Sequence, residues 1–390
     1  MTDRIVAIVY NTAFYVYKFR INLIKELQSQ GYRVVVVSPY DDYVVELRSL
    51  GIEHYNINMS QYGMNPIKEL LTTLEIYRFF QKCQPICSLH YTIKPNIFGG
   101  IAAALAGVPV ICNIAGAGRA FSDGRSILSH FISPLYRLGL SRASKVFFQN
   151  LDDLTLFTER GLVTSDIAER IPGSGVDLSR FSVSQSETKE GVFRFLFVGR
   201  LLKEKGVLEY LNAAKEVVES LGNKLVEFEI VGELDDTGAC IERLVLEKFL
   251  ESPNIKYLGA VSPVHMPDIV RRASCVVLPS YYREGIPRSL LEAAAMGKPI
   301  ITTNNVGCRD VVEDGINGYM IPVRDVDALT GAMRDMINLP ITERLQMGQS
   351  GRQKIELEFD EKFVLEAYRK AIAEVVNCTF RQDDIDANLS

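Results

Sequence analysis

The chain has 390 residues, of which 47% are apolar and 23% are charged, and its formal net charge at pH 7 is −5. This length exceeds one ordinary hydrophobic core and favours two domains, while the composition excludes a disordered chain. The weakly acidic balance argues against broad nucleic-acid binding. The seven cysteines form no CxxC pair, which favours a reduced protein of the cytoplasm.

Two segments bear on membrane insertion. The start, MTDRIVAIVY, is not followed by the cleavage site of a signal peptide, so we expect none. Residues 95–118 carry no charge and are long enough to span a bilayer. However, Gly107 and Pro109 divide this segment into a small-residue helix and a β-branched strand. That division predicts a buried α/β core instead of a transmembrane span.

Short β-branched runs alternate with amphipathic helical patterns in the first half of the chain. Helices are expected at 19–30 and 66–82, and Gly31 suits the C-terminal cap of the first. The expected strands cover residues 4–10, 33–38, 85–91, 108–114 and 145–150. This alternation predicts a parallel, doubly wound sheet.

The same pattern restarts after residues 172–192, which are rich in serine, glycine and charge and are typical of a linker. The expected strands of the second half cover residues 193–200, 226–232, 255–259, 275–280, 298–303 and 318–323, and a helix follows at about 360–377. We therefore expect an α/β fold with two tandem Rossmann-like domains facing across a cleft.

The expected boundaries follow from these patterns. They are an N-terminal domain (1–180), a linker (181–192), a C-terminal domain (193–358), a terminal helix (359–378) packing back on the first domain, and a polar tail (379–390). Ligands of open α/β sheets bind at the carboxyl ends of the strands, so chemistry is expected in the loops that follow strands.

The loop VGRLLKEKG at 198–206 ends one strand and opens a helix. Its two cations, Arg200 and Lys205, would lie near a helix N-terminus, and that combination suits a diphosphate. A solvated pair of basic residues at a helix start is an equally consistent interpretation.

The segment REGIPRSLLEAAAMGKP at 283–299 places Glu284 in a loop and Glu292 about two turns inside the following helix. Pro287 suits the first helical turn, where its missing N–H costs nothing. Carboxylates accept hydrogen bonds from vicinal hydroxyls, so one glutamate could hold a ribose and the other a sugar. The alternative is a capped helix with Glu292 in a surface ion pair.

Four motifs in this order resemble the retaining glycosyltransferases of family 4, which have the two-domain GT-B fold. The motifs are IPGSGVDLSRF (171–181), FVGRLLKEKG (197–206), PSYYREGIPRSLLEAAAMGKPIITTN (279–304) and GCRDVVEDGINGYMIP (307–322). Residues 113–121, 134–153 and 306–315 are similar to the capsule and surface-polysaccharide branch. Members of that branch extend a sugar carried on a polyprenyl diphosphate.

The resemblance implies transfer of a hexose or N-acetylhexosamine from a nucleotide-sugar, expected to be UDP-linked, with retention of the anomeric configuration. It makes residues 1–180 the acceptor-binding domain and residues 193–358 the nucleotide-sugar-binding domain. It places Glu284 at the transferred sugar and Glu292 on the ribose. Arg200 and Lys205 would neutralise the diphosphate in place of a metal, so the implied catalytic residues are Glu284, Arg200 and Lys205. The implied donor-binding residues are Gly199, Arg200, Lys205, Glu284, Gly285, Ile286, Pro287 and Glu292. Because no DxD motif stands in a cleft loop, we expect no metal and no cofactor.

The N-terminal half departs from the family pattern. The first loop, residues 10–20, lacks a Gly-Gly pair, and the place of the family's histidine reads NIAGAG. His90 follows another strand and either faces the cleft or is a satisfied structural histidine. The acceptor-side candidates are Lys18, His90, Lys94, Gly116, Gly118 and Arg119.

Residues 119–145 are basic, with interleaved apolar and aromatic side chains. The cations are Arg119, Arg125, Arg137, Arg142 and Lys145, against Asp123 as the acid. Such a stretch suits an anionic membrane surface or a lipid diphosphate, and a packing helix with a solvated basic rim is the alternative. We expect a cytoplasmic protein, peripheral on the inner face of the membrane, that binds no nucleic acid.

Two other functions fit the same fold. A nucleotide-sugar 2-epimerase would convert UDP-GlcNAc without an acceptor, and a non-catalytic partner of a synthesis complex would bind nucleotide and transfer nothing. The paired glutamates and the two cations favour the transferase.

Overall fold

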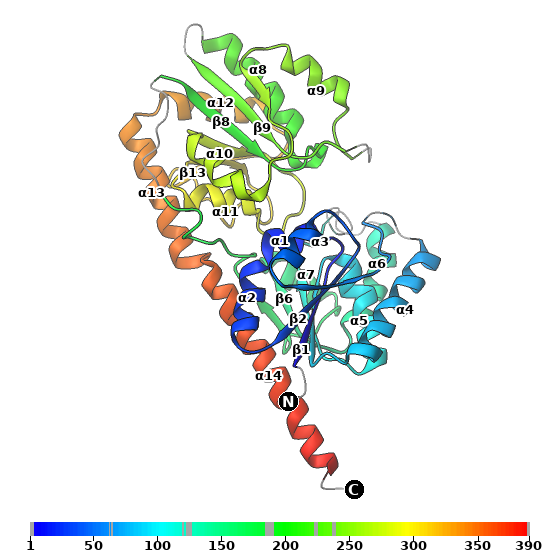
Figure 1. The fold of residues 1–390 in the computed structure, drawn as a ribbon. Coiled ribbons are helices and arrows are strands. Elements are labelled where there is room, and N and C mark those ends of the chain that lie inside the picture. The colour runs from blue at the N-terminus through cyan, green and yellow to red at the C-terminus, as the bar shows by residue number, and fades with distance from the viewer. Residues whose placement is uncertain are drawn as a thin grey trace. The chain divides into compact units, whose positions relative to one another are not determined.

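The computed structural model describes residues 4–61, 63, 65–118, 121, 127–183, 191–221, 225–235 and 239–387. The chain forms two compact units, Met1–Ser174 with Lys362–Ser390, and Gly175–Glu361 (Figure 1). The first boundary therefore falls before the expected linker. Residues after Gly175 pair with the end of the second unit, because Val176 N–H donates to the Phe359 carbonyl (3.0 Å) and Glu361 N–H donates to the Val176 carbonyl (3.1 Å).

Within the described residues the first unit has a parallel sheet of seven strands, in the order β3-β2-β1-β4-β5-β6-β7. The strands are β1 (Ile5–Val9), β2 (Arg33–Ser38), β3 (Glu53–Asn56), β4 (Cys87–Tyr91), β5 (Val110–Ile114), β6 (Ala143–Phe148) and β7 (Ala168–Arg170). The sequence pattern missed β3 and β7, because these short edge strands lack a buried β-branched run.

Two helical layers cover this sheet. One contains α1 (Ala13–Phe19), α2 (Ile21–Ser29), α3 (Tyr43–Ser49) and α14 (Glu361–Ala387), and the other contains α4 (Pro66–Cys83), a π-helix η1 (Pro95–Gly99), α5 (Gly100–Ala106), α6 (Ile127–Leu140) and α7 (Leu151–Glu159). Alternate residues of β1 pack against opposite layers, Val6 and Ile8 against the first and Ala7 and Val9 against the second. This alternation explains why the strands read as continuous apolar runs.

The helices differ from expectation at two places. The expected helix 19–30 corresponds to α2 (Ile21–Ser29), and the sequence reasoning missed α1 (Ala13–Phe19). Arg20 has a non-helical backbone (φ −127°) and separates the two helices. Helix α14 continues to Ala387 and passes the expected end at 378. Residues 95–118 divide into helix and strand at Gly107, as predicted. Over the parts of the chain that the structure describes, no helix has the length and apolarity needed to span a membrane.

The second unit has a sheet of six strands within its described residues, in the order β10-β9-β8-β11-β12-β13. The strands are β8 (Phe193–Val198), β9 (Val226–Val231), β10 (Ile255–Tyr257), β11 (Cys275–Leu278), β12 (Ile300–Thr303) and β13 (Gly318–Ile321). The surrounding helices are η3 (Lys203–Lys205), α8 (Val207–Leu221), α9 (Arg243–Leu250), η4 (Pro263–His265), α10 (Met266–Arg272), α11 (Arg288–Ala295), α12 (Val326–Asn338) and α13 (Ile341–Glu358).

In each unit the strand order reverses beside the first strand. The reversal lies between β1 and β4 in the first sheet, and between β8 and β11 in the second. Ligands of open α/β sheets bind at such a switch point, beyond the carboxyl ends of the two strands. The fold thus directs attention to the loops that follow β8 and β11, and to those that follow β1 and β4.

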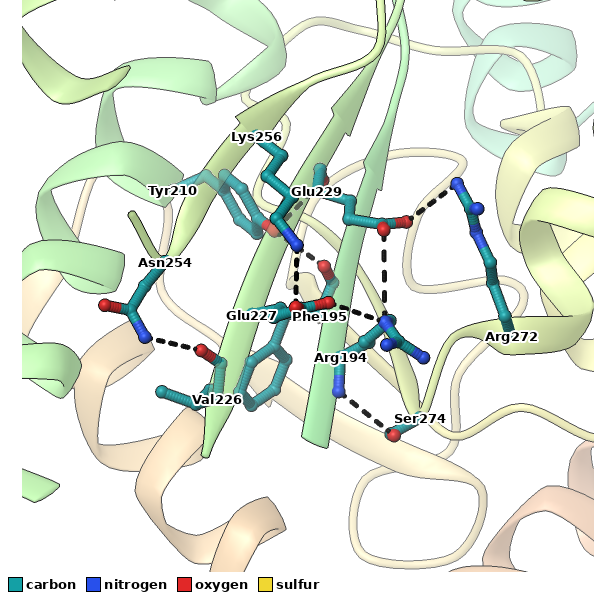
Figure 2. Close-up of polar contacts among 10 residues, drawn as sticks. All are labelled: Arg194, Phe195, Tyr210, Val226, Glu227, Glu229, Asn254, Lys256, Arg272 and Ser274. Atoms are coloured by element: carbon teal, nitrogen blue, oxygen red, sulfur yellow. Dashed lines mark hydrogen bonds and ion pairs between the residues drawn. The ribbon is translucent and has the colours of Figure 1, made fainter. Parts of the chain in front are cut away.

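A charged ladder crosses the second sheet near the amino ends of its strands (Figure 2). Arg194 on β8 and Lys256 on β10 both pair with Glu227 on β9, at 2.7 and 2.6 Å. Glu229, which is buried, lies 3.3 Å from Arg272 and 3.9 Å from Arg194. The ladder therefore lies at the opposite end of the sheet from the β8 and β11 loops.

Candidate active site

The loops that follow β8 and β11 are joined by their backbones. The Glu204 carbonyl accepts hydrogen bonds from Tyr281 N–H (2.9 Å) and Tyr282 N–H (3.0 Å). Gly206 has a left-handed backbone (φ +76°), and a Cβ at this position would lie 2.1 Å from the Pro279 carbonyl oxygen. Only glycine permits this approach. The contact brings together the loop with the predicted cations and the loop with the first predicted carboxylate.

Lys205 and Glu284 form an ion pair at this switch point. Lys205 Nζ donates to Glu284 Oε1, and Ser280 Oγ donates to the same oxygen at 3.1 Å. The Glu284 side chain is 10% exposed and that of Lys205 17%. A pair shielded to this extent interacts more strongly than one on the surface. The structure thus joins two of the three predicted catalytic residues.

Ser280 is itself held from the neighbouring strand. Thr303, the last residue of β12, donates its hydroxyl to the Ser280 carbonyl, and Asn305 Nδ2 donates to the carbonyls of Ser280 (3.3 Å) and Tyr282 (2.7 Å). The position of Glu284 therefore depends on the end of β12. The sequence reasoning did not assign a role to Ser280, Thr303 or Asn305, although polar residues stand at the ends of both strands.

The loop that carries Glu284 also packs closely against Gly307. Gly307 has φ +81°, and a Cβ there would lie 1.9 Å from the Gly285 carbonyl oxygen and 3.0 Å from Glu284 Cβ. The adjacent Cys308 is fully buried, and burial, together with the negative charge of Glu284, raises the pKa of its thiol to about 12. Cys308 is therefore a packing residue, because a thiol with this pKa is not a nucleophile at neutral pH.

Glu292 lies on α11 in a buried ion pair with Arg288. Arg288 Nε is 3.0 Å from Glu292 Oε1, and both side chains are largely shielded from solvent. The alternative interpretation, which placed Glu292 in a surface ion pair, is correct about the pair and wrong about its exposure. Glu292 stands about one turn inside the helix instead of two, because α11 begins only at Arg288 and Pro287 is its N-cap in an extended conformation (ψ 115°).

Arg200 and Gly199 come directly after β8. Gly199 N–H donates to the Val231 carbonyl at 3.0 Å, and Arg200 is half-buried. A Cβ at Gly232 would lie 1.7 Å from the Gly199 carbonyl oxygen, so a glycine is required there and the sequence reasoning did not single it out. The remaining predicted donor-binding residues, Gly285 and Ile286, are buried beside Glu284.

His90, an acceptor-side candidate, lies inside the core of the first unit. It is fully buried on β4, its Nε2 is 2.9 Å from Ser88 Oγ, and its ring stacks on Phe80. Burial lowers the pKa of His90 to about 3, so the imidazole is neutral. A Cβ on Gly99 would lie 2.9 Å from the imidazole. The structure corrects the ligand-facing interpretation in favour of the structural one.

The two lysine candidates already have contacts. Lys94 is buried, and its Nζ donates to Glu69 Oε1 and to Ser60 Oγ, both at 2.6 Å. A buried carboxylate therefore balances its charge, and the acceptor-side role of Lys94 stays a prediction. Lys18 on α1 lies 5.6 Å from the ring of Phe14 and 5.3 Å from that of Phe19.

The predicted glycine pair follows β5. Gly116 and Gly118 both have positive φ values, +117° and +66°. The N–H between them, that of Ala117, donates to Asp153 Oδ2 at 3.0 Å. This N–H is therefore used within the unit. Arg119 lies outside the described residues.

Two polar residues at the switch point of the first unit were missed. The register Val9↔His90 places Asn11 near Thr92 just beyond the strand ends. Thr92 has φ +67°, and its hydroxyl and the Asn11 side-chain oxygen are buried without a hydrogen-bond partner among the described residues. Strain and unsatisfied polar atoms cluster at functional sites. No sequence signal marks a left-handed threonine.

Over the described residues no group of three or more His, Cys, Asp or Glu side chains could hold a metal ion. The expected independence of the chemistry from metal stays a prediction.

Comparisons with known proteins cover both units. The family model described as glycosyl transferases group 1 matches residues 179–354, and the model described as glycosyl transferase 4-like matches residues 4–150. The first range contains all of the predicted donor-binding residues.

Relatives with described activities extend this finding. The chain is 26% identical to the N,N'-diacetylbacillosaminyl-diphospho-undecaprenol alpha-1,3-N-acetylgalactosaminyltransferase of Campylobacter jejuni, over 93% of this chain and 96% of that protein. It is 27% identical to the UDP-Gal:alpha-D-GlcNAc-diphosphoundecaprenol alpha-1,3-galactosyltransferase of Escherichia coli, over 68% and 70% of the two chains. It is 25% identical to the capsular polysaccharide biosynthesis glycosyltransferase CapM of Staphylococcus aureus, over 76% and 79%.

Solved structures agree on the fold. A glycosyltransferase of Rickettsia africae gives a TM-score of 0.77 at 17% identity, covering 96% of this chain and 99% of the other. The Anabaena protein HepE, solved in complex with UDP and glucose, gives 0.77 at 16% identity, covering 95% and 100%. These likenesses confirm the expected α/β fold with two Rossmann-like domains.

Proposed function

Because the chain belongs to the glycosyltransferases, with a group 1 domain and a family 4-like domain, we propose that it extends a lipid-linked sugar during surface-polysaccharide or glycan synthesis. The donor is a nucleotide-sugar, UDP-linked, that supplies a hexose or an N-acetylhexosamine. The observation that carries this proposal is the Lys205–Glu284 ion pair, which lies at the switch point of the group 1 domain.

The donor would lie along the line from the β8 loop to α11. Arg200 and Lys205 supply positive charge for the diphosphate, Glu284 accepts hydrogen bonds from the transferred sugar, and the Arg288-supported Glu292 accepts them from the ribose. Lys205 is already held beside Glu284. The charge that would stabilise the leaving group is therefore positioned before the reaction, without a large reorganisation cost.

The proposed reaction retains the anomeric configuration. The bond between the anomeric carbon and the diphosphate oxygen breaks, and its electron pair leaves with the nucleoside diphosphate. The acceptor hydroxyl forms the new bond on the same face, and its proton passes to the departing phosphate oxygen. The developing charge is on the diphosphate, which is where the two cations are expected to act without a metal.

The acceptor is proposed to be a polyprenyl-diphosphate-linked sugar. Support comes from the printed names of the Campylobacter and Escherichia relatives, which act on undecaprenyl-diphosphate-linked sugars. A long polyprenyl chain stays in the bilayer, so the enzyme would work as a cytoplasmic protein at the anionic inner face of the membrane and would bind no nucleic acid. The 2-epimerase alternative loses support because these relatives are named as transferases.

The test is release of nucleotide from a panel of UDP- and GDP-sugars, with and without polyprenyl-diphosphate-sugar acceptors and with EDTA. We expect release that needs one donor and the lipid acceptor together and that continues in EDTA. Loss of activity in EDTA would overturn the metal-independent chemistry. Isomerisation of UDP-GlcNAc without an acceptor would replace the transferase with the epimerase.

A further inference from the structure

The outer side of one helical layer in the first unit is unusually apolar. Helices α4, α5 and α6 lie next to one another over the same face of the sheet, with α5 packed against both of its neighbours (Figure 1). Their exposed large apolar residues are Ile67, Leu70, Leu71, Leu74, Leu105, Leu128, Phe131 and Leu138. Ile67 is 72% exposed, Leu105 68% and Phe131 70%. We call the outer side of this layer the α4–α6 face.

Helix α4 carries two apolar faces instead of one. Ile76, Phe79 and Phe80 are buried in the core, as the inward stripe of an amphipathic helix requires. Ile67, Leu70, Leu71 and Leu74 follow the i, i+3, i+4, i+7 spacing of a second stripe that is exposed to solvent. Packing within the unit does not explain this second stripe. A contiguous exposed apolar surface marks an interaction site.

The exposed charges that extend the apolar stripes are cations. On α4 the outward stripe continues into the exposed cations Arg78 and Lys82. The exposed apolar residues of α6 are Leu128, Phe131 and Leu138, and the exposed Arg142 follows just after the helix ends at Leu140. The α4 acids turn elsewhere, since Glu69 is buried against Lys94 and Glu75 accepts hydrogen bonds from Asn58. Residues 95–118 and 127–142 contain no acidic residue.

We propose that the α4–α6 face lies on an anionic lipid bilayer, with its apolar residues in the boundary between headgroups and acyl chains and its cations at the headgroups. The two helices share one pattern, an apolar stripe that ends in cations, which is typical of interfacial amphipathic helices. The negative surface potential of the inner leaflet attracts such cations. A protein partner would need no uniform positive rim, so the charge pattern favours the bilayer.

This surface overlaps only in part with the basic stretch that the sequence suggested at 119–145, because it shares α6 and Arg142 with that stretch and adds α4 and α5. Arg119 and Arg125 lie outside the described residues. Arg137 donates to the carbonyls of Gly161 (3.0 Å) and Arg160 (3.2 Å), and Lys145 pairs with Glu169 at 3.1 Å. The apolar stripe of α4 was hidden in the sequence, because Ile67 to Leu74 read as part of an ordinary core helix.

The bilayer proposal rests on the proposed function for its biological role but can be tested apart from it. The purified chain is sedimented with vesicles of phosphatidylcholine alone and of phosphatidylcholine with phosphatidylglycerol. The test variant is Leu70→Ser/Leu71→Ser/Leu74→Ser, and a second variant, Arg78→Glu/Lys82→Glu, keeps the stripe and reverses the cations. The control variant, Leu244→Ser/Leu345→Ser/Leu357→Ser, removes comparably exposed leucines from the second unit.

We expect the wild type and the control to bind the anionic vesicles and prefer them to neutral ones. Both α4 variants should bind the anionic vesicles at least about tenfold more weakly. The leucine variant loses apolar burial, and the charge-reversed variant loses attraction to the headgroups. Equal binding of wild type and the leucine variant would overturn the proposal. So would a wild-type dimer in solution that the leucine variant converts to monomer, since the face would then be covered by a second copy.

Activity separates this proposal from the proposed function. With a short-chain acceptor in detergent, all variants should transfer sugar at the wild-type rate, while the α4 variants lose transfer to a vesicle-embedded acceptor. Vesicle binding by the α4–α6 face without transfer to any acceptor would overturn the proposed function and leave the bilayer surface standing. Transfer in both settings by the α4 variants would overturn the surface alone.

Discussion

Two sets of ion pairs lie at opposite ends of the second sheet, and they are built differently. In the ladder, most of the side chains come from strands, and each glutamate contacts two cations. Glu227 pairs with Arg194 and Lys256, and Glu229 pairs with Arg194 and Arg272. At the switch point, Lys205 and Glu284 stand on loops that glycine contacts hold together. The ladder is a balanced network within regular structure, whereas the loop pair places its charges where a ligand can enter. Burial and ion pairing alone therefore do not identify a site; the element that carries the charge does.

The largest expected effect comes from breaking the loop pair. Glu284→Gln should lower kcat about a thousandfold, because it removes a charge that is proposed to act on the transferred sugar, and losses of about 10²–10³ are usual when one group that stabilises a transition state is removed. The free energy of unfolding should also fall, by about 1–3 kcal/mol, because the largely shielded Lys205 ammonium loses its carboxylate. Kinetics with the best donor and acceptor from the panel, and urea unfolding, measure both.

The matched control for this change is Glu313→Gln in the same unit, which removes an exposed carboxylate from Lys354 while Lys354 keeps its second partner, Glu358. It should leave both kcat and stability close to wild type. Wild-type activity of Glu284→Gln would remove Glu284 from the site.

Breaking the ladder should lower the free energy of unfolding and leave kcat unchanged. Glu229→Gln removes the carboxylate that pairs with Arg272. It should lower the free energy of unfolding by about 2 kcal/mol. This is less than the usual cost of breaking a buried pair, because Arg194 keeps its other partner, Glu227. The kcat of the folded protein should be unchanged. Urea titration gives the first quantity, and turnover at a temperature well below unfolding gives the second.

Glu227→Gln sharpens this test within the ladder. Its side chain is more exposed than that of Glu229, so the expected loss of stability is smaller, about 1 kcal/mol. A fall in kcat for either ladder variant would mean that the two ends of the sheet are coupled.

The smallest effect concerns His90 and the pH dependence of stability. Its folded-state pKa of about 3 lies below the ordinary value of 6.5, so the unfolded chain takes up a proton first as the pH falls. The stabilisation is full above pH 6.5 and is lost between pH 6.5 and about 3, with a slope of at most about 1.4 kcal/mol per pH unit.

His90→Gln should reduce this slope by up to about 1.4 kcal/mol per pH unit, which corresponds to one proton, and should leave the pH profile of kcat unchanged. Unfolding free energies from urea titrations at several pH values between 4 and 7 supply the slope. His54→Gln is the control, because His54 is only partly buried and its pKa is lowered less far. A changed pH profile of kcat in His90→Gln would restore His90 as an acceptor-side residue.

The sequence predicted the features that repeat. Buried parallel strands read as apolar runs, so most strands and both sheets were found, and β3 and β7 were missed because edge strands do not need that pattern. The family motifs marked Lys205 and Glu284 separately as site residues, but the contact between them was not predicted. What could not be predicted depends on three-dimensional packing. The sequence does not show that His90 and Lys94 point inward, that Ser280 supports Glu284, or that one α4 stripe faces solvent.

The return of the chain to the first unit affects the order in which the protein can fold. Val364, Tyr368 and Ile372 of α14 belong to the same core as β1, and the Tyr368 hydroxyl lies 3.0 Å from Asn113 Nδ2 on β5. On the ribosome, residues 4–174 emerge first but lack this helix until the final codons have been read. The second unit, contiguous from Gly175 to Glu361, can finish folding earlier. The unit that starts the chain is thus the last to be completed, and a fragment ending at Ser174 would carry an open core.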